Sequence, residues 1–293
     1  MFIDVQNSKD TRGIAIDKVG IKNLRYPISV LDRKKSLQHT VAGINMYVDL
    51  PHYFKGTHMS RFLEVLNEYR GEVSIVKFPD ILRKIKHVLN ANSASVEMEF
   101  PYFIEKTAPV SGKKSLMEYV CYYNGTIRGT GKDSGVPPGA KKERSDAVTR
   151  LKHVKSENIA EDKKGWGEES IIRIGVKVPV NTLCPCSKEI SEYGAHNQRG
   201  IVSVSLEFKK LIWFEDIIDD VESCASSPVY SLLKRADERF LTEHAYNNPM
   251  FVEDVARCVA GVFKKNKDIK WYRVEAENFE SIHNHNAYAM IEK

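Results

Sequence analysis

Two cysteines and one histidine lie close together in the sequence, and all three side chains are of types that bind metal ions. Cys184 and Cys186 flank a proline after an alternating apolar segment (Ile171 to Val180) that predicts a strand, and His196 follows one short loop later. Residues two apart on an extended strand share a face, so both thiols could reach one ion. Thiolate and imidazole suit borderline ions such as Zn²⁺. Since the chain has no Cys-x-x-Cys pair, the pattern indicates an open, catalytic site with room for water.

Further acid–base side chains occur toward the carboxyl end. Glu280, His283 and His285 lie between two predicted strands, a pattern that is also typical of a polar hairpin with solvated histidines. Glu238 lies in a helix-like stretch, where carboxylates are usually solvated. Glu253 falls in the first turn of a predicted helix, where a carboxylate is favoured by the helix dipole in any case. Taken singly, none of these residues indicates a site.

A basic cluster opens a predicted helix in the first half of the chain. Lys55, His58 and Arg61 stand at this point, after which apolar residues recur at helical spacing. The backbone N–H groups of a helix start suit a phosphate group. The alternative is that these cations are simply exposed.

Composition indicates a soluble globular protein. The chain has 293 residues, 42% of them hydrophobic, and its formal charge is 44 − 39 = +5. This charge is compatible with an anionic substrate, but no basic face with interleaved aromatic residues suggests nucleic acid.

Five cysteines argue against a disulfide framework and make a reducing cytoplasm the more natural location. With no secretory signal and no apolar run near ~20 residues, we expect a cytoplasmic protein without membrane contact.

The order of predicted elements repeats, and each half reads as two strands, two helices and two strands. We expect a first module over residues 1–128, a polar insertion over 129–165 with a short helix near Ser145 to Val154, and a second module over 166–293 that carries the metal site. The predicted strands are Leu24–Leu31, Gln38–Leu50, Ser95–Thr107, Ser115–Arg128, Ser170–Val180, Gly200–Lys209, Trp271–Asn278 and Asn286–Ile291. The predicted helices start at Thr57 and after Pro79, and then cover Phe214–Ser223, Tyr230–Phe240 and Phe251–Lys265.

Five ordered segments resemble the type IB GTP cyclohydrolases. They are Asp10-Thr11-Arg12-Gly13, Gln38-His39-Thr40, Lys55-Gly56-Thr57-His58-Met59-Ser60-Arg61-Phe62, Leu183-Cys184-Pro185-Cys186-Ser187-Lys188 and Glu277-Asn278-Phe279-Glu280-Ser281-Ile282-His283-Asn284-His285. The resemblance covers nearly the whole chain except the segment around residues 129–165, where we expect the family to have a short connection. It implies an α+β protein with a tandem (bimodular) tunnelling fold, in which two ββααββ units with antiparallel sheets and helices on one face assemble into a barrel.

The resemblance also implies roles for individual residues. Cys184, His196 and Glu238 would bind a divalent metal, which could be Mn²⁺, Zn²⁺ or Fe²⁺. Glu253 would recognise guanine, and His283 would transfer protons. The remaining expected site residues are Cys186 beside the metal, His285 as a less favoured proton-transfer group, and Lys55, His58 and Arg61 on the triphosphate.

The implied reaction is hydrolysis of guanine C8 in GTP, which gives formate and 7,8-dihydroneopterin triphosphate at the first step of tetrahydrofolate and pterin biosynthesis. The family is typically a homotetramer with active sites at subunit interfaces. Two alternatives stay open. One is an archaeal-type Fe²⁺ enzyme that ends in a cyclic phosphate of dihydroneopterin, and the other is a non-catalytic purine-binding protein on the same scaffold.

Overall fold

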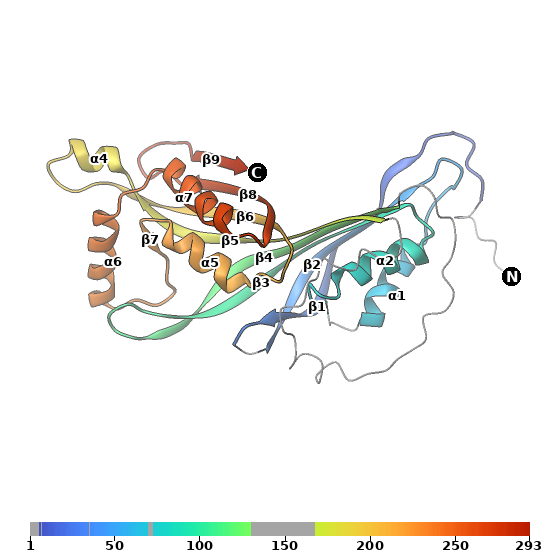
Figure 1. Cartoon of the computed structure of the whole chain (residues 1–293), viewed down its shortest axis with the longest axis horizontal. Coiled ribbons are helices and arrows are strands. Elements are labelled where there is room, and N and C mark those ends of the chain that lie inside the picture. The colour runs from blue at the N-terminus through green and yellow to red at the C-terminus, as the bar shows by residue number, and fades with distance from the viewer. Residues whose placement is uncertain (1–5, 7, 35, 70–72, 130–167) are drawn as a thin grey trace. The chain divides into compact units, whose positions relative to one another are not determined.

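The computed structural model describes residues 6, 8–34, 36–69, 73–129 and 168–293 (Figure 1). These residues form an antiparallel sheet of nine strands in the order β1-β2-β3-β4-β5-β6-β8-β9, with β7 paired to β5. The strands are β1 (Ile16–Asp32), β2 (Ser36–Leu50), β3 (Ser93–Thr107), β4 (Lys114–Gly129), β5 (Glu168–Leu183), β6 (Asn197–Phe208), β7 (Ser227–Pro228), β8 (Ile269–Asn278) and β9 (Ala287–Glu292). The helices are α1 (Ser60–Tyr69), α2 (Phe78–Val88), α4 (Pro185–Ile190), α5 (Phe214–Ser223), α6 (Arg235–Asn247) and α7 (Val252–Lys265).

The expected α+β class and the repeated strand–helix order are confirmed. The first half has the predicted order β1, β2, α1, α2, β3 and β4. The second half keeps β5, β6, α5, α7, β8 and β9 in that order and adds the short elements α4 and β7. The helix predicted over Tyr230–Phe240 is α6, which covers Arg235–Asn247 instead. The first helix begins at Ser60 rather than at the predicted Thr57. The short helix expected near Ser145 to Val154 lies outside the described residues.

None of the described helices is both long enough and apolar enough to cross a membrane.

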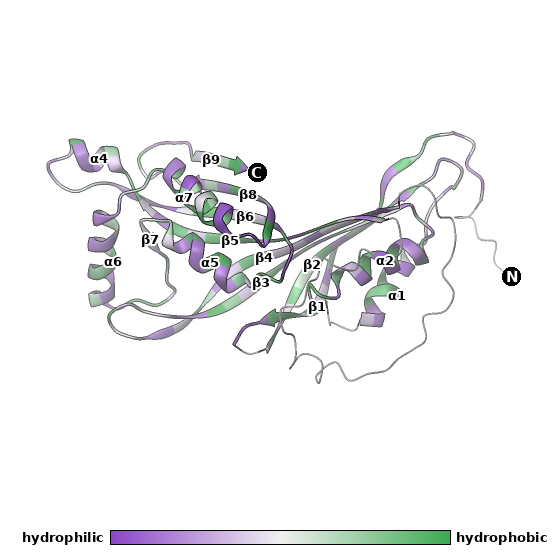
Figure 2. Cartoon of the chain, in the orientation of Figure 1, coloured by the Kyte–Doolittle hydropathy of each residue, from purple (hydrophilic) through white to green (hydrophobic). Residues whose placement is uncertain are grey.

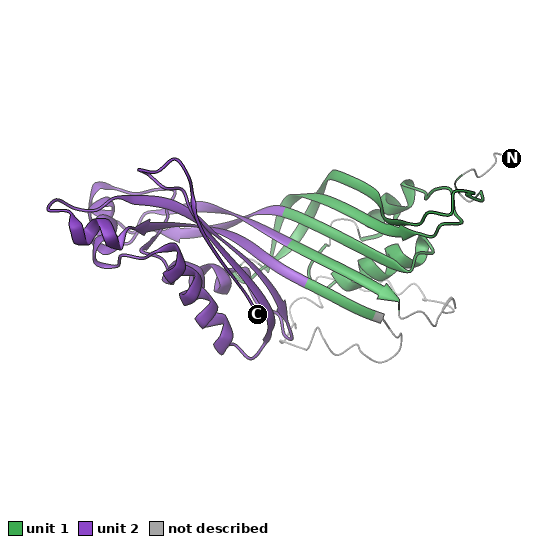
Figure 3. Cartoon of the chain, turned by 90° about the horizontal axis from the view of Figure 1, so that it is seen from above, with its two compact units in different colours: residues 1–99, 123–172 green, residues 100–122, 173–293 purple. Residues whose placement is uncertain are grey.

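The contacts divide the chain into two compact units that interleave in sequence (Figure 3). Unit 1 comprises residues 1–99 and 123–172, and unit 2 comprises residues 100–122 and 173–293. The strands β3 and β4 therefore each contribute to both units. The predicted modules, by contrast, are consecutive in sequence.

Unit 1 has its core between the sheet and the apolar faces of α1 and α2. Gly125 on β4 marks the closest approach, because a Cβ there would lie 2.6 Å from the Phe78 ring and 2.7 Å from Leu82 of α2. Burying each large apolar side chain contributes about 1.5–3 kcal/mol. The helix residues of this core are Phe62, Val65, Leu66, Phe78, Ile81, Leu82 and Ile85, and they are at most 1% exposed.

Unit 2 buries the apolar faces of α5 and α7, whereas α6 is mostly hydrophilic at its surface (Figure 2). The helix α6 has only two buried residues, Asp237 and Ala245. Because so little apolar area holds this helix, its position must depend on polar contacts. The buried helix residues of the main core are Phe214, Ile217, Ile218, Val221, Val252, Val255, Ala256, Val259, Ala260 and Phe263.

Polar side chains of the segment 100–122, which belongs to unit 2, bind α5 and the loop after β7. Lys106 Nζ lies 2.8 Å from both carboxylate oxygens of Glu222 and donates to the Val229 carbonyl at 2.9 Å. The Tyr119 hydroxyl donates to the same carboxylate at 2.7 Å. Burial, followed by the negative charge of Glu222, raises the pKa of Tyr119. A buried ion pair with this many partners fixes the place of α5 against the strands more than it adds net stability.

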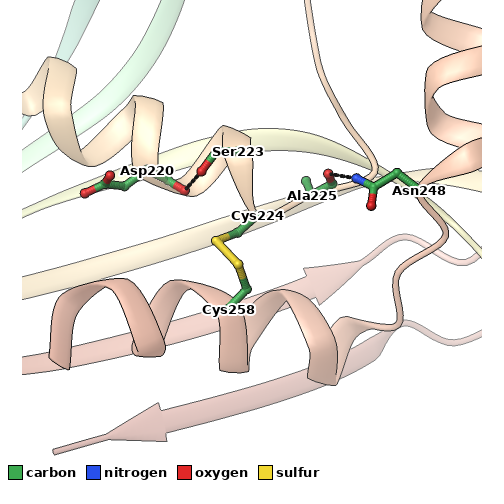
Figure 4. The surroundings of a disulfide bond; sticks show 6 residues. All are labelled: Asp220, Ser223, Cys224, Ala225, Asn248 and Cys258. Atoms are coloured by element: carbon green, nitrogen blue, oxygen red, sulfur yellow. Dashed lines mark hydrogen bonds between the residues drawn. A yellow bond between two sulfur atoms is a disulfide. The ribbon is translucent and has the colours of Figure 1, made fainter. Parts of the chain in front are cut away.

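A disulfide joins α5 to α7 in unit 2 (Figure 4). Cys224 follows the last residue of α5, Cys258 lies in α7, and their Cα atoms are 5.5 Å apart. The sequence argued against a disulfide framework, and this single pair was not foreseen. The sequence separation of 34 residues gave no sign of it, because only the packing of the two helices brings the thiols together.

We predict that reducing this disulfide lowers stability without unfolding the protein. In the chain-entropy account, closing a loop of this length stabilises by about 3–4 kcal/mol. Urea unfolding of Cys224→Ser/Cys258→Ser should show this loss, whereas the exposed Cys186→Ser control should match the wild type. Titration of the unfolded wild-type chain without reductant should find 5 − 2 = 3 thiols. Finding five thiols would contradict the pairing.

Candidate metal and substrate site

Cys184 lies at the point where β5 gives way to α4. It is the N-cap of α4, and its Sγ accepts a hydrogen bond from Ser187 N at 3.4 Å. Pro185 takes the first helical position, where a missing N–H costs nothing and the fixed φ suits the helix. Cys186 is therefore an exposed helical residue. The expectation that both thiols share a strand face is wrong, because the strand ends before Cys184.

The backbone places Cys184 directly beside His196. Cys184 N donates to His196 O at 3.1 Å, which continues the antiparallel pairing of Leu183 with Asn197. The hydroxyl of Ser187 connects the same two residues, since it donates to Cys184 O at 3.1 Å and accepts from His196 N at 3.2 Å. The predicted metal ligands Cys184 and His196 are thus brought together by main-chain geometry.

The imidazole of His196 is held through one nitrogen. Its Nδ1 lies 3.0 Å from Gln198 Oε1 and 3.1 Å from Ser281 Oγ. An imidazole whose Nδ1 donates to such oxygens presents the lone pair of Nε2, which is the form that binds a metal. The strand β6 begins at Asn197 rather than at the predicted Gly200, and it carries Gln198 to the same side as His196.

The segment between β8 and β9 comes to the same strand end. Phe279 N donates to Arg199 O at 2.9 Å, and Ser281 contacts the His196 ring. His283 and His285 follow in this segment, both exposed, with stacked rings whose centroids are 5.2 Å apart. The predicted proton-transfer group therefore lies in the segment that contacts a predicted metal ligand.

A backbone hydrogen bond holds the start of α7 next to Cys184. Met250 N donates to Leu183 O at 3.0 Å, and Asp254 caps the helix by accepting from Phe251 N at 3.1 Å. Glu253 is exposed in this first turn. Its carboxylate stands two residues into a helix that starts from the strand end carrying Cys184.

Glu238 is not gathered with the other predicted ligands. It is an exposed residue in the first turn of α6. Across the described ranges, no cluster of three or more His, Cys, Asp and Glu residues is arranged to hold a metal ion. Cys184 and His196 are thus neighbours, whereas the third predicted ligand stands apart.

The predicted phosphate-binding residues belong to unit 1, whereas all the other site residues belong to unit 2. Lys55 is exposed, and its N–H donates to Ser8 O at 3.1 Å. His58 is half-buried just before α1. Arg61 donates through Nη1 to Val88 O, the last carbonyl of α2, at 3.2 Å. This contact orients the guanidinium of Arg61.

Comparison with known families decides the membership of the chain. The sequence model described as type I GTP cyclohydrolase folE2 matches residues 2–136 and 140–289. The chain belongs to this family. The curated relative called GTP cyclohydrolase FolE2 from Syntrophus aciditrophicus (strain SB) is 55% identical over 292 residues, which cover 100% of both chains. The protein of the same name from Geobacter sulfurreducens is 49% identical, covering 99% of this chain and 97% of the relative.

The cyclohydrolase family match also corrects one expectation. It runs through most of residues 129–165, which we had expected to be an insertion without a counterpart in the family. That expectation is wrong, because the relative from Syntrophus aligns over its full length. The segment is therefore part of what this chain shares with its relatives.

Among solved structures, the fold matches a urate oxidase. A highly active mutant of Bacillus sp. TB-90 urate oxidase aligns with a TM-score of 0.52 at 7% identity, over 95% of this chain and 99% of that one. An identity this low speaks to architecture alone. It agrees with the tunnelling fold that the motifs imply.

Asp237, the neighbour of Glu238, anchors α6 and was missed from the sequence. This fully buried carboxylate accepts hydrogen bonds from Val110 N and Ser111 N at 2.8 Å, from Ser111 Oγ at 2.6 Å and from Lys234 N at 2.8 Å. Burial alone would raise the pKa of Asp237, but the hydrogen bonds from Ser111, Lys234 and Val110 lower it overall, well below its usual range. A Lys-x-x-Asp helix start is a weak signal, because the partners come from a distant hairpin.

We predict that Asp237→Asn lowers stability in a pH-dependent way. Since the folded-state pKa lies below the unfolded value of about 3.9, the stabilisation is complete above that value and is lost as the pH falls toward the folded pKa. At pH 7 the urea midpoint of Asp237→Asn should be below that of the wild type, and the gap should shrink between pH 5 and pH 3. Glu243→Gln on the same helix, which loses one exposed ion pair with Arg239, should change stability by only about 0.5 kcal/mol. A gap that stays constant with pH would contradict this role.

Proposed function

We propose that this chain hydrolyses GTP at guanine C8 and releases formate and 7,8-dihydroneopterin triphosphate, the first step of pterin and tetrahydrofolate biosynthesis in the cytoplasm. Family membership supports the reaction class. The observation that carries the proposal is the convergence at one strand end: Cys184 pairs with His196, and the segment of His283 contacts the His196 ring.

The donor set fits a divalent metal. Cys184 offers a half-buried sulfur, and His196 offers Nε2 because Nδ1 is engaged. In the proposal Glu238, in the first turn of α6, would be the third ligand. Thiolate with imidazole suits Zn²⁺, and the carboxylate makes Mn²⁺ and Fe²⁺ equally acceptable. A divalent ion in such a site lowers the pKa of water from 15.7 toward about 7 and so supplies a nucleophile at neutral pH.

Glu253 recognises the base. Its carboxylate has two oxygens that can accept parallel hydrogen bonds from the ring N1–H and the exocyclic amine of guanine. The hydrogen bond from Met250 N to Leu183 O holds the start of α7 beside Cys184, and this places the Glu253 carboxylate relative to the nucleophile. Guanine bound at its pyrimidine edge turns C8, at the opposite end, away from Glu253.

His283 moves the protons. Attack of water at C8 must be followed by protonation of the ring nitrogens before the imidazole ring of guanine opens, and then by hydrolysis of the formyl group. An imidazole titrates near neutrality and can act as acid and then as base. The stacked ring of His285 supports His283 in this role, and Cys186 lies on the neighbouring helix α4.

Lys55, His58 and Arg61 neutralise the triphosphate. Two cations and an imidazole that precede or open α1 match a group carrying three to four negative charges. We place the enzyme in a homotetramer whose active sites lie at subunit interfaces, so that the residues of unit 1 and unit 2 in one site can come from different copies.

The test is formate release. Purified protein loaded with Mn²⁺, Fe²⁺ or Zn²⁺ should convert GTP to equal amounts of formate and dihydroneopterin triphosphate. Cys184→Ala should lower turnover by at least about 10³-fold and lose its metal, whereas Glu189→Ala, an exposed residue of α4, should behave as wild type. No formate with any of the three metals would overturn the proposal, and a cyclic phosphate would assign the product differently. Full metal content in Cys184→Ala would remove Cys184 from the ligand set.

Base recognition has a separate test. Inosine triphosphate lacks the exocyclic amine, so the wild type should bind it about 10–100-fold more weakly than GTP, the worth of one hydrogen bond to a charged group. Glu253→Ala should bind both nucleotides equally weakly and keep its metal. If Glu253→Ala still preferred GTP, another residue would recognise guanine.

A further inference from the structure

A buried polar pair stands behind His196. Thr182 and Gln198 are direct partners in the antiparallel pairing of β5 with β6. Because alternate residues share a face, they lie on the same side as Cys184 and His196, one step deeper along the strands. Thr182 is 0% exposed and Gln198 is 7% exposed.

The nitrogen and the oxygen of the Gln198 amide contact different residues. Its Nε2 donates to Thr182 Oγ1 at 3.1 Å, and its Oε1 lies 3.0 Å from His196 Nδ1. A primary amide has donors only at nitrogen and acceptors only at oxygen. With the nitrogen turned to Thr182, the oxygen must accept the proton of His196 Nδ1, which leaves Nε2 with a lone pair.

The opposite amide orientation would have the opposite effect. Turned by 180°, Gln198 would present N–H groups to His196 Nδ1, and the imidazole would carry its proton on Nε2. That tautomer has no lone pair on Nε2 and could bind a metal only through Nδ1, the nitrogen that Gln198 and Ser281 contact. The Ser281 hydroxyl, 3.1 Å from the same Nδ1, can either donate or accept and so does not select a tautomer by itself.

We propose that Gln198 is a positioning residue: its Oε1 holds His196 in the Nδ1–H tautomer and in the ring orientation that presents Nε2, and its hydrogen bond to Thr182 anchors the amide. This inference rests on the proposed metal site. The two proposals can be tested separately, because the role of Gln198 concerns how tightly the site binds the metal, whereas the proposed function concerns the turnover of GTP. Removing such an outer hydrogen-bond partner typically weakens metal binding 10–100-fold.

Three variants of the full-length protein test the role. Gln198→Met keeps the volume but removes both ends of the amide. Gln198→Glu keeps the acceptor for His196, and the Thr182 hydroxyl can donate to it. Thr182→Val removes the hydrogen bond that anchors the Gln198 amide. Zn²⁺ affinity is measured by competition with a chromophoric chelator, and Co²⁺ loaded in place of Zn²⁺ reports the thiolate charge-transfer band and the coordination geometry.

We expect Gln198→Met to bind Zn²⁺ about 10–100-fold more weakly than the wild type. The Zn²⁺ affinity of Thr182→Val should also be lower than that of the wild type. Gln198→Glu should bind Zn²⁺ at least as tightly as the wild type. A purely structural role of Gln198 would not be rescued by glutamate. If Gln198→Met does not fold, the other two decide: equal affinities of Thr182→Val and Gln198→Glu would overturn the inference.

The outcomes separate this inference from the proposed function. If the wild type binds neither Zn²⁺ nor Co²⁺, or if Cys184→Ala keeps the thiolate–Co²⁺ band, the proposed metal site itself is wrong. If the wild type binds through Cys184 and Gln198→Met binds equally well with an unchanged Co²⁺ spectrum, only the role of Gln198 is overturned.

Discussion

The candidate site depends on one constraint, the hydrogen bonding of the backbone where β5 ends. Leu183 N donates to Ser226 Oγ at 3.0 Å, and Leu183 O accepts from Met250 N at 3.0 Å. The next residue, Cys184, donates from its N–H to His196 O. Two consecutive residues thereby hold the segment before β7, the start of α7 and the start of β6. Because each bond is buried or half-buried, leaving one unmade would cost about 1–3 kcal/mol, which makes the arrangement specific.

Apolar burial and polar anchoring have different tasks in unit 2. The faces of α5 and α7 supply the core, and burial of this kind is non-directional. Lys106 with Glu222 and the hairpin with Asp237 then determine where α5 and α6 lie along the strands. The helix that carries Glu238 is thus held by the polar contacts of the neighbouring residue Asp237.

Local pattern accounts for what could be predicted from the sequence. Period-two alternation gave the strands, and helical spacing gave α1, α2, α5 and α7, because both patterns follow from burying one face. Cys184 and His196 could be named because two thiols and an imidazole lie within a short stretch of sequence, and they meet because they flank the last pair of β5 with β6, Leu183 with Asn197. The N-cap role of Cys184 was not foreseen, although Pro185 at the next position is a known sign of a helix start.

Partners that are distant in the chain account for what was missed. Asp237 binds residues more than 120 positions away, and Cys224 pairs with Cys258 only through helix packing. Gln198 lies before the predicted strand start at Gly200, and only the pairing with Thr182 shows which way its side chain points. Glu238 and Glu253 took their roles from the family motifs, because a carboxylate in a first helical turn has an ordinary explanation.

The most direct measurement for the account is the location of the metal by anomalous diffraction from crystals grown with Mn²⁺ or Zn²⁺. The account predicts one strong peak per chain, bound by Cys184 Sγ and His196 Nε2 and completed by the Glu238 carboxylate. A peak bound through His196 Nδ1, a peak remote from Cys184, or no peak in active protein would contradict it.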